Sequence, residues 1–594
     1  DLSNASVTSL DEALQKLTPS FSSMTNGMGT TLSLNGLPDD YFIFLENGKR
    51  LYGDDTYARI NVAKIKRIEI LNGASSALYG TNAIGGVINI ITDDAKNAIN
   101  VSSDTRYASK GRFTQSVNID VNTGKFGSYT SYRRQQAEGW QLNPYEENSK
   151  THELEETGKV ASTGFYANTV NQKFTFDATD KLSFYARGGY YDNKTRRPYE
   201  AYDYNILHET FNYGIGAQYM INKGNYITAD CYADHFSSSY CFFKDNKTYN
   251  GKAGEEQVRK RTRNHNLSIK GIFKLGNRHK LSVGTEYIVD VLKSQTDNIA
   301  KEDAYTLALF AQDEIKLLRN LQALIGVRYI YHENFKNHAT PNVALMYKPG
   351  KFNFRASYAA GFRTPTLSEL YATDIAKKND RLTIGNLDLK PEKNNYFSLS
   401  AEYVHERFSV SVNAFYNNIR DMIDYNTIAT GDKAMEQYGH KEVRQRDNIA
   451  EAKVHGINVS ANAYLGAGFN LSGGYTHLNT QDVELEQPID KSIKNAYNIN
   501  AQWAHSWKIY RLNINLNGRI NSKRFSKSYG YAPEYQLWDL NTRHSFNLKS
   551  VIIEPGFGME NLFDYMDDRP YNSNYATLTP GRSFYISLSL KFKS

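Results

Sequence analysis

The stretch Phe584-Tyr-Ile-Ser-Leu-Ser-Leu-Lys-Phe592, close to the C-terminal end, decides the fold class. Apolar residues fill every second position, and Tyr, Ser or Lys fills the positions between them. Successive side chains of a β-strand point to opposite faces, so this stretch predicts a strand with one continuous apolar face. An apolar face backed by a polar face suits lipid on one side and water on the other.

The same alternation recurs from about Ile99 to the end of the chain. In Phe408-Ser-Val-Ser-Val-Asn-Ala-Phe-Tyr416 the larger apolar residues share one face, while Ser409, Ser411 and Asn413 lie on the other. Leu182-Ser-Phe-Tyr-Ala-Arg-Gly-Gly-Tyr190 behaves in the same way, with Arg187 on its polar face. Gly, Asn, Asp or Lys separates such segments, as expected for turns between strands.

Composition supports a membrane barrel. Aromatic residues make up 13% of the chain, including 44 Tyr, although the mean hydropathy is only −0.59. A transmembrane barrel carries aromatic girdles at both interfaces and polar residues in its lumen, which explains both values. No run of about 18 apolar residues occurs, so the sequence excludes membrane-spanning helices. We therefore predict an all-β membrane protein whose residues 96–594 form a 22-stranded transmembrane antiparallel β-barrel.

A soluble β-sandwich or propeller is the alternative, because its strands also alternate. A propeller would repeat every 40–50 residues or so with recurring motifs, and the sequence has no such repeat. A sandwich of this length would divide into domains, yet no Pro- or Ser-rich linker interrupts the segment. Over 22 strands, roughly 22 residues remain for each strand and its loop, which fits strands of about 10 residues with short turns and long loops.

Residues 1–95 have a different pattern, which predicts a small α+β domain. Residues 10–17 have helical spacing, with Leu10, Ala13, Leu14 and Leu17 on one face and Ser9 as the N-cap. Short strands follow, separated by Asn-Gly turns. We expect these strands at Thr31–Leu34, Tyr41–Leu45, Arg67–Leu71 and Val87–Ile91, with turns at Asn47-Gly48 and Asn72-Gly73.

Net charge and the absence of known motifs mainly exclude classes of function. The net charge of +7 is small for 594 residues and dispersed, which argues against nucleic acid as a partner. The sequence contains no catalytic motif and no metal-binding spacing, so we predict neither an enzyme nor a resident metal or cofactor. Cys231 and Cys241 fit either one disulfide or two free thiols. The start at Asp1 shows no signal-peptide pattern, and we expect that such a peptide has been removed.

A long motif in the N-terminal domain resembles the TonB-dependent outer-membrane receptor family. It runs Ile65-Lys-Arg-Ile-Glu-Ile-Leu-Asn-Gly-Ala-Ser-Ser-Ala-Leu-Tyr-Gly80 and continues as Ala83-Ile-Gly-Gly-Val-Ile-Asn-Ile-Ile-Thr92. Asn72 and Ala74 depart from the family pattern of Arg and Pro, which puts an Arg-based lock between domain and barrel in doubt at this point. The residues that carry the match are Arg67, Glu69, Gly73, Tyr79, Gly80, Gly85 and Gly86.

The barrel segment carries a second match to the family. Gly361-Phe-Arg-Thr-Pro-Thr-Leu-Ser-Glu-Leu-Tyr371 and Gly385-Asn-Leu-Asp-Leu-Lys-Pro-Glu392 are similar to its paired barrel motifs. The matching residues are Arg363, Pro365, Asn386 and Leu389.

The resemblance implies a function and a location. Residues 1–95 would form a plug inside the lumen of the barrel, in the outer membrane of a Gram-negative bacterium. The chain would import a scarce cargo, energised by the TonB–ExbB–ExbD complex of the inner membrane. No TonB box precedes Ser9, so we expect the plug to be incomplete at its N-terminus. A passive porin or an adhesin barrel is the alternative from another class, and the plug motif argues against both.

Charge and aromaticity suggest the cargo. Haem transporters of the family usually ligate iron through a plug His and a second His between the barrel motifs, but the first His here is His152 and none lies between Phe362 and Glu392. Arginine and tyrosine together suit an anionic, aromatic iron chelate of the siderophore type. We therefore predict that the ligand-binding residues are Arg196, Arg197, Tyr199, Tyr202, Tyr204, Arg259, Arg261 and Arg263.

Several alternatives stay open at this point. Haem could still bind through Tyr or arrive from a surface lipoprotein, and cobalamin is the runner-up cargo. Asp39-Asp40, Asp54-Asp55 and Asp567-Asp568 are acidic pairs without calcium-loop spacing. The basic residues could instead contact the phosphates of lipopolysaccharide.

Overall fold

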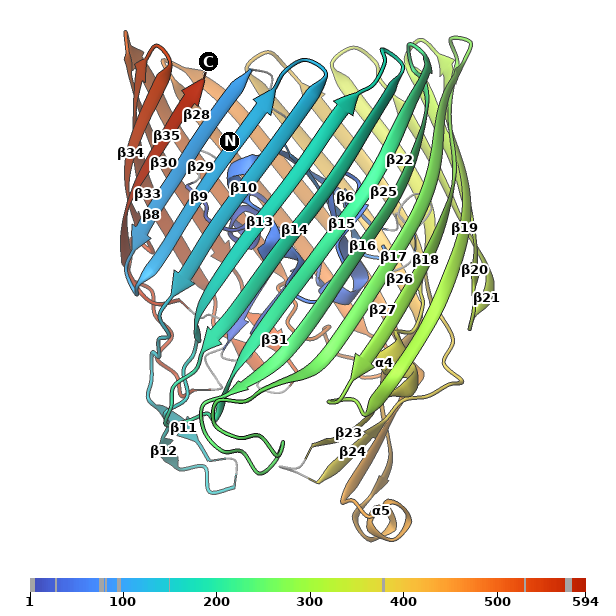
Figure 1. Cartoon of the computed structure of the whole chain (residues 1–594), viewed down its shortest axis with the longest axis vertical. Coiled ribbons are helices and arrows are strands. Elements are labelled where there is room, and N and C mark those ends of the chain that lie inside the picture. The colour runs from blue at the N-terminus through green and yellow to red at the C-terminus, as the bar shows by residue number, and fades with distance from the viewer. Residues whose placement is uncertain are drawn as a thin grey trace.

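The computed structural model describes residues 6–26, 29–73, 80, 83–92, 98–148, 150–376, 380–527, 530–571 and 579–593. A tall barrel of tilted strands surrounds the N-terminal domain, which lies inside the lumen (Figure 1). This arrangement confirms the predicted fold class of a β-barrel with an N-terminal α+β plug.

The barrel wall contains 22 antiparallel strands, as predicted. The circuit closes where β35 pairs with β8, with Tyr585 opposite Ala108 and Phe592 opposite Val101. The strands of the wall are β8 (Ile99–Ala108), β9 (Arg112–Asn122), β10 (Phe126–Ala137), β13 (Gly164–Asp177), β14 (Leu182–Arg196), β15 (Tyr204–Asn222), β16 (Asn225–Phe242), β17 (Glu256–Leu275), β18 (His279–Ser294), β19 (Ile299–Leu318), β20 (Leu321–His332), β21 (Lys336–Tyr347), β22 (Phe352–Arg363), β25 (Glu392–Val404), β26 (Phe408–Thr430), β27 (Glu442–Gly466), β28 (Phe469–Asp482), β29 (Asn495–Trp507), β30 (Tyr510–Asn521), β33 (Tyr535–Leu548), β34 (Val551–Glu560) and β35 (Ser583–Lys593).

Shorter elements lie in the loops. β22 pairs directly with β25, so the β23–β24 hairpin between them stands outside the wall, and β24 pairs in parallel with β27. The remaining loop elements are α4 (Leu367–Tyr371), α5 (Gly431–Tyr438), β11 (Tyr145–Glu147), β12 (Leu154–Glu156), β23 (Thr373–Ala376), β24 (Arg381–Ile384), β31 (Arg524–Ser526) and β32 (Gly530–Ala532).

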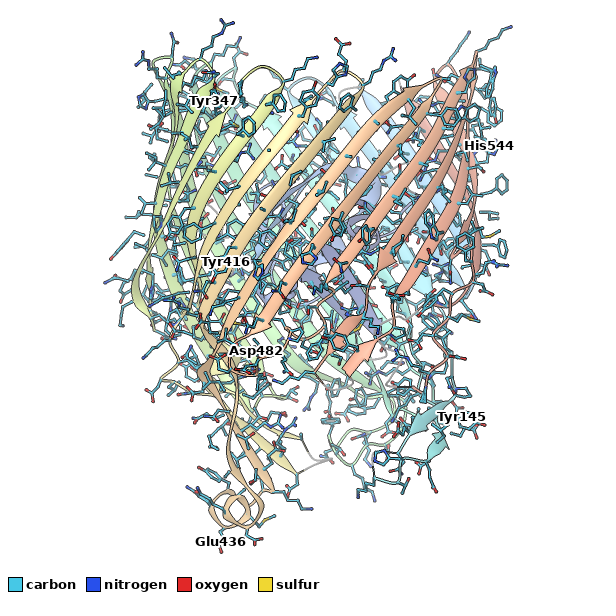
Figure 2. All side chains as sticks on the ribbon, turned by 180° about the vertical axis from the view of Figure 1, so that it is seen from behind. Tyr145, Tyr347, Tyr416, Glu436, Asp482 and His544 are labelled. Atoms are coloured by element: carbon cyan, nitrogen blue, oxygen red, sulfur yellow. The ribbon has the colours of Figure 1, made fainter. Side chains whose placement is uncertain are left out.

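The alternation in the sequence corresponds to the two faces of the wall. On β35, Phe584 is 56% exposed and Leu588 is 42% exposed, whereas Tyr585 and Ser589 are buried at 7% and 6%. Apolar side chains cover the outer face of the barrel, where Figure 2 shows Tyr416 near mid-height. No helix among the described residues is long and apolar enough to span a membrane.

The two ends of the barrel differ. One end has short turns, and the other carries long loops with β11–β12, β23–β24 and α5 at the tip of the extended β26–β27 hairpin (Figure 1). Outer-membrane barrels have short periplasmic turns and longer extracellular loops, so the end with α5 is the extracellular one.

The plug folds around its own apolar core. Leu14, Phe21, Phe44 and Ile88 belong to the cluster of buried side chains between its helix and its sheets. Its strands form a three-stranded sheet (β1-β2-β3) and a four-stranded sheet (β5-β4-β7-β6). Its elements are α2 (Leu10–Leu17), β1 (Phe21–Asn26), β2 (Gly29–Leu34), β3 (Leu37–Pro38), η1 (Asp39–Tyr41), β4 (Phe42–Glu46), β5 (Lys49–Arg50), η2 (Thr56–Arg59), η3 (Val62–Lys64), β6 (Ile65–Asn72) and β7 (Gly86–Thr92).

Local predictions for the plug are confirmed, with small corrections. The helix has the predicted bounds, and Ser9 accepts a hydrogen bond from the backbone N–H of Glu12. Leu17, predicted on the buried face, is instead 38% exposed because it ends the helix. β1 was not predicted because its sequence, Phe-Ser-Ser-Met-Thr-Asn, has no apolar alternation. The predicted domain boundary at residue 95 lies outside the described residues.

The two cysteines are free thiols. Both Cys231 and Cys241 lie on β16, where ten residue steps separate them by roughly 33 Å along the strand. A disulfide needs Cα atoms within about 7 Å, so the geometry rules out the bridge that the sequence left open.

Candidate transport site

A cavity of about 840 Å³ lies between the plug and the barrel wall formed by β15 to β20. We call it the lateral cavity. The β4–β5 hairpin and the following plug residues form its inner side, and α4 borders it at the extracellular end. Its outer side is hydrophilic because lumen-facing positions of the strands carry hydroxyl and amide groups. These wall residues include Gln218, Thr228, Thr262, Asn266, Ser268 and Thr306.

Ion pairs connect the plug to this wall. The Nζ atom of Lys49 lies 2.5 Å from an Asp230 carboxylate oxygen, and that of Lys260 lies 3.2 Å from an oxygen of Asp54. All four side chains keep some solvent exposure, so each pair contributes little to stability. Asn72 accepts a hydrogen bond from Asn35 at 3.0 Å, a contact within the plug.

A buried ion pair stands beside the same wall. Arg59 of the plug donates to both carboxylate oxygens of Asp234 on β16, at 2.9 and 3.2 Å. The backbone N–H of Tyr52 donates to the same carboxylate at 3.0 Å. Removing either charge would leave the other buried without its partner, which makes this the strongest polar tie on this side of the plug.

Two carboxylates occupy the extracellular apex of the plug. Enclosure within the lumen, reinforced by the neighbouring charge of Asp40, raises the pKa of Asp39 to about 6. Enclosure also raises the pKa of Asp40, although Arg363 opposes the change. Asp40 lines the lateral cavity. The apex therefore loses negative charge as the pH falls toward 6 and below.

The barrel motif places α4 above the plug. Arg363, at the end of β22, is buried and donates to both oxygens of Glu369 at 2.9 and 3.0 Å. It also pairs with Glu392 on β25, which accepts from the hydroxyl of Tyr41 in the plug at 3.3 Å. This network joins the α4 loop, the wall and the plug apex, so the motif has a positioning role.

The other residues of that motif hold the same loop. Pro365 lines the lateral cavity. Asn386 donates to the backbone oxygen of Arg446 at 3.0 Å, and Leu389 is buried in a cluster with Leu370 and Ile423.

Part of the predicted ligand-binding set forms a cluster at the extracellular end. The guanidinium carbon of Arg197 lies 4.7 Å from the ring centroid of Tyr202 and 5.2 Å from that of Tyr204. The guanidinium of Arg259 lies 5.3 Å from Tyr240 and 5.0 Å from Tyr249.

Stacking joins these two groups into one. The rings of Tyr204 and Tyr240 stack at 4.1 Å, and Tyr249 meets Tyr204 edge-on at 5.7 Å. Arg259 also precedes Lys260 of the lateral cavity. We call Arg197, Tyr202, Tyr204, Tyr240, Tyr249 and Arg259 the Arg–Tyr cluster.

Three predicted arginines, Arg196, Arg261 and Arg263, lie apart from the Arg–Tyr cluster. Arg261 and Arg263 share a strand face with Leu267 and Ile269, which are exposed on the outside of the barrel. Arg196 lies over Tyr166, also on the outer face, with 4.8 Å between guanidinium and ring centroid. Strand alternation turns all three side chains toward the surroundings of the barrel, and Arg263 also borders the lateral cavity.

Tyr199 is also separate from the cluster. It is exposed on its loop, packs on Phe243 with ring centroids 5.5 Å apart, and lies 4.0 Å from the ammonium group of Lys244. Sequence reasoning missed Tyr240 and Tyr249. Their neighbours in the cluster lie on other strands and are distant in sequence. The abundance of Tyr in this region was the only sequence feature that could have indicated them.

The plug motif has mainly structural roles. A Cβ atom at Gly73 would overlap the ring of Tyr396 on β25, so this glycine permits close approach to the wall. Gly86 adopts φ of 147°, and a Cβ there would lie 2.5 Å from the backbone oxygen of Leu71. Arg67 pairs with Glu69 at 2.7 Å on the surface of the plug.

The remaining motif glycines occupy turns, and one motif residue is not described. The N–H of Gly85 donates to the backbone oxygen of Tyr41 at 2.7 Å. Gly80 has φ of 86° and lines the lateral cavity. Tyr79 lies outside the described residues.

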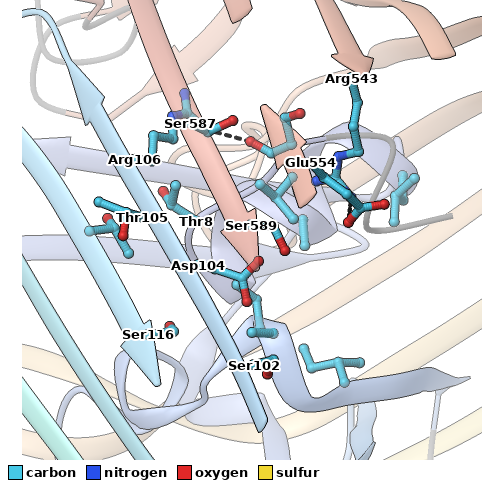
Figure 3. A pocket seen from close by; sticks show the side chains of 18 of the residues that line it. Thr8, Ser102, Asp104, Thr105, Arg106, Ser116, Arg543, Glu554, Ser587 and Ser589 are labelled. Atoms are coloured by element: carbon cyan, nitrogen blue, oxygen red, sulfur yellow. Dashed lines mark hydrogen bonds and ion pairs between the residues drawn. The ribbon is translucent and has the colours of Figure 1, made fainter. Parts of the chain in front are cut away.

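A second cavity of about 610 Å³ lies on the other side of the plug. We call it the seam cavity because β8 and β35, the strands that close the barrel, form its wall. Figure 3 shows Ser102, Asp104 and Arg106 of β8 and Ser587 and Ser589 of β35 around it. Its inner side is the face of α2 and β6.

The part of the chain that the structure describes contains no group of three or more His, Cys, Asp or Glu side chains placed to hold a metal ion.

Two protein-family models match this chain, one over the barrel and one over the plug. The family model described as TonB dependent receptor-like, beta-barrel matches residues 111–562, and the TonB-dependent Receptor Plug Domain matches residues 1–87. This chain belongs to the TonB-dependent receptor family. It is thus an outer-membrane β-barrel of a Gram-negative bacterium, as predicted.

Solved receptors share the fold over their full length. A mutant of the ferric enterobactin receptor PfeA from Pseudomonas aeruginosa aligns with a TM-score of 0.84 and 17% identity, covering 100% of this chain and 97% of that one. The siderophore receptor PirA from Acinetobacter baumannii gives 0.81 and 17%, with 100% and 97% covered. The FrpB iron transporter from Neisseria meningitidis gives 0.77 and 15%, with 99% and 97% covered. At these identities the likeness establishes the fold of a TonB-dependent receptor.

Proposed function

We propose that this chain imports an anionic iron chelate of the siderophore type across the outer membrane by TonB-dependent transport. One observation carries the proposal: the Arg–Tyr cluster places two guanidinium groups against four tyrosine rings at the extracellular end of the barrel. A ferric catecholate combines negative charge with flat aromatic rings. Guanidinium groups bind such a ligand by charge and by stacking, and tyrosine adds a rigid aromatic surface.

A third arginine also lies over a tyrosine ring, beside the lateral cavity. The guanidinium of Arg446, which lines the lateral cavity, lies 3.6 Å from the ring centroid of Tyr425 and donates to its hydroxyl at 2.6 Å. Basic groups at both places raise the local concentration of an anion before it reaches the plug. The similar receptors include a ferric enterobactin receptor and siderophore receptors, which supports the same class of cargo.

The energy for release would come from the inner membrane. In this proposal the TonB–ExbB–ExbD complex acts on the plug, residues 1–95, after the chelate has bound outside. The barrel itself would carry lipopolysaccharide in the outer leaflet. Arg261 and Arg263 face outward there, and Lys293 pairs opposite Arg261 on β18. Loss of co-purified lipopolysaccharide on replacing these three residues with Ala would test that contact.

Haem is the second candidate, because His332 of β20 lines the lateral cavity near its extracellular end. Equilibrium binding to the purified receptor separates the candidates. We expect a ferric catecholate to bind, and haem and cobalamin to bind at least a hundredfold more weakly. Tight haem binding that is lost in His332→Ala would transfer the proposal to haem.

A further inference from the structure

The plug contacts the barrel in two different ways on two sides. On one side, the plug residues Leu37, Tyr41 and Ile84 are buried against the wall of β22 to β28. Their partners there are apolar and well packed: Ala359, Tyr396, Phe415, Ile419, Ala452, Val454 and Leu478. We call this contact the dry wall. Moving the plug off it would expose apolar surface to water and open voids in a close-packed contact.

Further round the wall, at β15 to β20, the plug meets the lateral cavity. The ties across it are the Lys49–Asp230 and Asp54–Lys260 pairs, with Arg59–Asp234 alongside. The first two keep solvent exposure, and water can replace each partner as the groups separate. The buried Arg59–Asp234 pair lies outside β4–β5 and can stay in place, so movement of that hairpin alone disrupts less than separating the plug from the dry wall.

The lateral cavity also extends over the depth of the membrane. On β17 its lining runs from Lys260, near the extracellular end, to Ile272, near the periplasmic turn. Twelve residue steps of a strand tilted by about 40° cover roughly 30 Å along the barrel axis. This height equals the thickness of a bilayer's hydrocarbon core.

The seam cavity covers a smaller part of the depth of the membrane. Its lining runs from Ser102 to Arg106 on β8 and from Tyr585 to Lys591 on β35, and the longer of these covers about 20 Å along the strand. Arg106 and Arg112 both pair with Glu560, and Lys16 of the plug pairs with Asp539 at 2.9 Å. The Lys16–Asp539 pair joins α2 to β33, and the Glu560 pairs join β34 to β8 and β9 at the extracellular limit of the seam cavity.

We infer that cargo crosses the barrel through the lateral cavity, widened by movement of the β4–β5 side of the plug, while the plug stays seated on the dry wall. This inference rests on the proposed function for its cargo but not for its geometry. The hydroxyl and amide groups of the β15–β20 wall form a hydrophilic surface along which a hydrated anionic chelate can pass. At the dry wall the amide groups of Asn394 and Asn417 are buried and hydrogen-bonded to each other, so they form no open hydrophilic surface.

Single cysteines test which side opens. Ser268 of β17 lines the lateral cavity, and Ser411 of β26 faces the lumen on the strand that forms part of the dry wall. Both serines are half-buried, so Ser268→Cys and Ser411→Cys are matched in burial. Each is made in a background in which Cys231 and Cys241 are replaced by Ser. A bulky, charged methanethiosulfonate reagent that cannot cross the outer membrane is added to intact cells.

Two readouts are taken from each variant, before and after labelling. The first is the labelling rate, which needs no cargo: we expect Ser268→Cys to react at least tenfold faster than Ser411→Cys. The second is uptake of a ferric catecholate: labelling Ser268→Cys should lower uptake at least tenfold, reversibly with reductant, while surface binding of the chelate persists. Labelled Ser411→Cys should keep its uptake.

Opposite results would overturn the inference. Equal labelling rates would mean that the lateral cavity is not the open side. Uptake that survives labelling at position 268 would mean that cargo passes elsewhere or that the whole plug leaves. If the unlabelled cells import no ferric catecholate, the proposed cargo fails, and the labelling rates alone still decide between the two walls.

Discussion

The guanidinium of Arg59 in the plug lies 2.9 Å from a carboxylate oxygen of Asp234 in β16, and both side chains are almost completely buried, at 4% and 0% exposure. The pair joins the two domains inside the lumen. Burial removes both charges from water, so each depends on the other, and the Asp234 carboxylate also accepts from the backbone N–H of Tyr52.

Arg59→Ala should therefore weaken the attachment of the plug to the barrel wall. The change leaves the Asp234 carboxylate buried without its cation, at a cost of about 3–5 kcal/mol. Asp234→Asn in the same chain should restore part of the loss, because the amide carries no charge. Limited proteolysis of the plug in detergent-purified receptor measures the effect. Equal digestion of Arg59→Ala and wild type would show that this pair does not hold the plug.

The register of β35 predicts a contrast between neighbouring positions. Leu588→Arg places a charge on the lipid face near the middle of the strand, which should cost about 2–4 kcal/mol. Ser587→Arg should be much milder because Ser587 lines the seam cavity inside the barrel. The folded fraction in outer membranes, read from heat-modifiable mobility on gels, compares them. Equal losses would contradict the assigned register.

The fold could be predicted from the sequence because its signals are local and periodic. The alternation in Phe584–Phe592 fixes both the strand and its faces, and Leu10–Leu17 carries its own cap and helical spacing. The closure of β35 on β8 was also predictable, since a barrel must join its first and last strands.

The candidate site was only partly predictable, because one residue step decides which way a side chain points. Arg261 and Arg263 lie one step out of phase with Lys260, which faces the lumen. Arg259 is an exception because it lies in a β-bulge. Ser238 pairs with Lys260 and Ser239 pairs with Val258, so Arg259 is the extra residue and the alternation of side chains is interrupted there. Nothing in the local sequence predicts that bulge.

Loss of the Arg–Tyr cluster should weaken cargo binding. Arg197→Ala and Arg259→Ala should each raise the Kd for a ferric catecholate by about 10- to 100-fold, since a charge-assisted contact contributes about 1.5–3 kcal/mol. Added salt should weaken wild-type binding for the same reason. Arg196→Ala is the matched control, because Arg196 faces outward over Tyr166. Equal effects at positions 196 and 197 would remove the cluster from the binding site.

Binding should also depend on pH through the plug apex. With a pKa of about 6, the Asp39 carboxyl is ionised at pH 7.5 and mostly neutral at pH 5.5. A neutral apex repels an anionic chelate less, so affinity should rise on acidification, by about threefold to fivefold for one charge at roughly 10 Å in a hydrated lumen. Isothermal titration at both pH values measures this. Asp39→Asn should bind at pH 7.5 as wild type does at pH 5.5, and an unchanged pH dependence in this variant would exclude Asp39 as the cause.

The most direct test of TonB-dependent iron import is uptake of radioactive iron by cells that produce this receptor and lack their own siderophore receptors. The cells receive iron as a ferric catecholate, with and without a protonophore that removes the energy supply of the inner membrane. We predict surface binding under both conditions, and accumulation inside the cell only while the inner membrane is energised. Accumulation no greater than in cells without the receptor, or equal accumulation with the protonophore present, would contradict TonB-dependent import of an iron chelate.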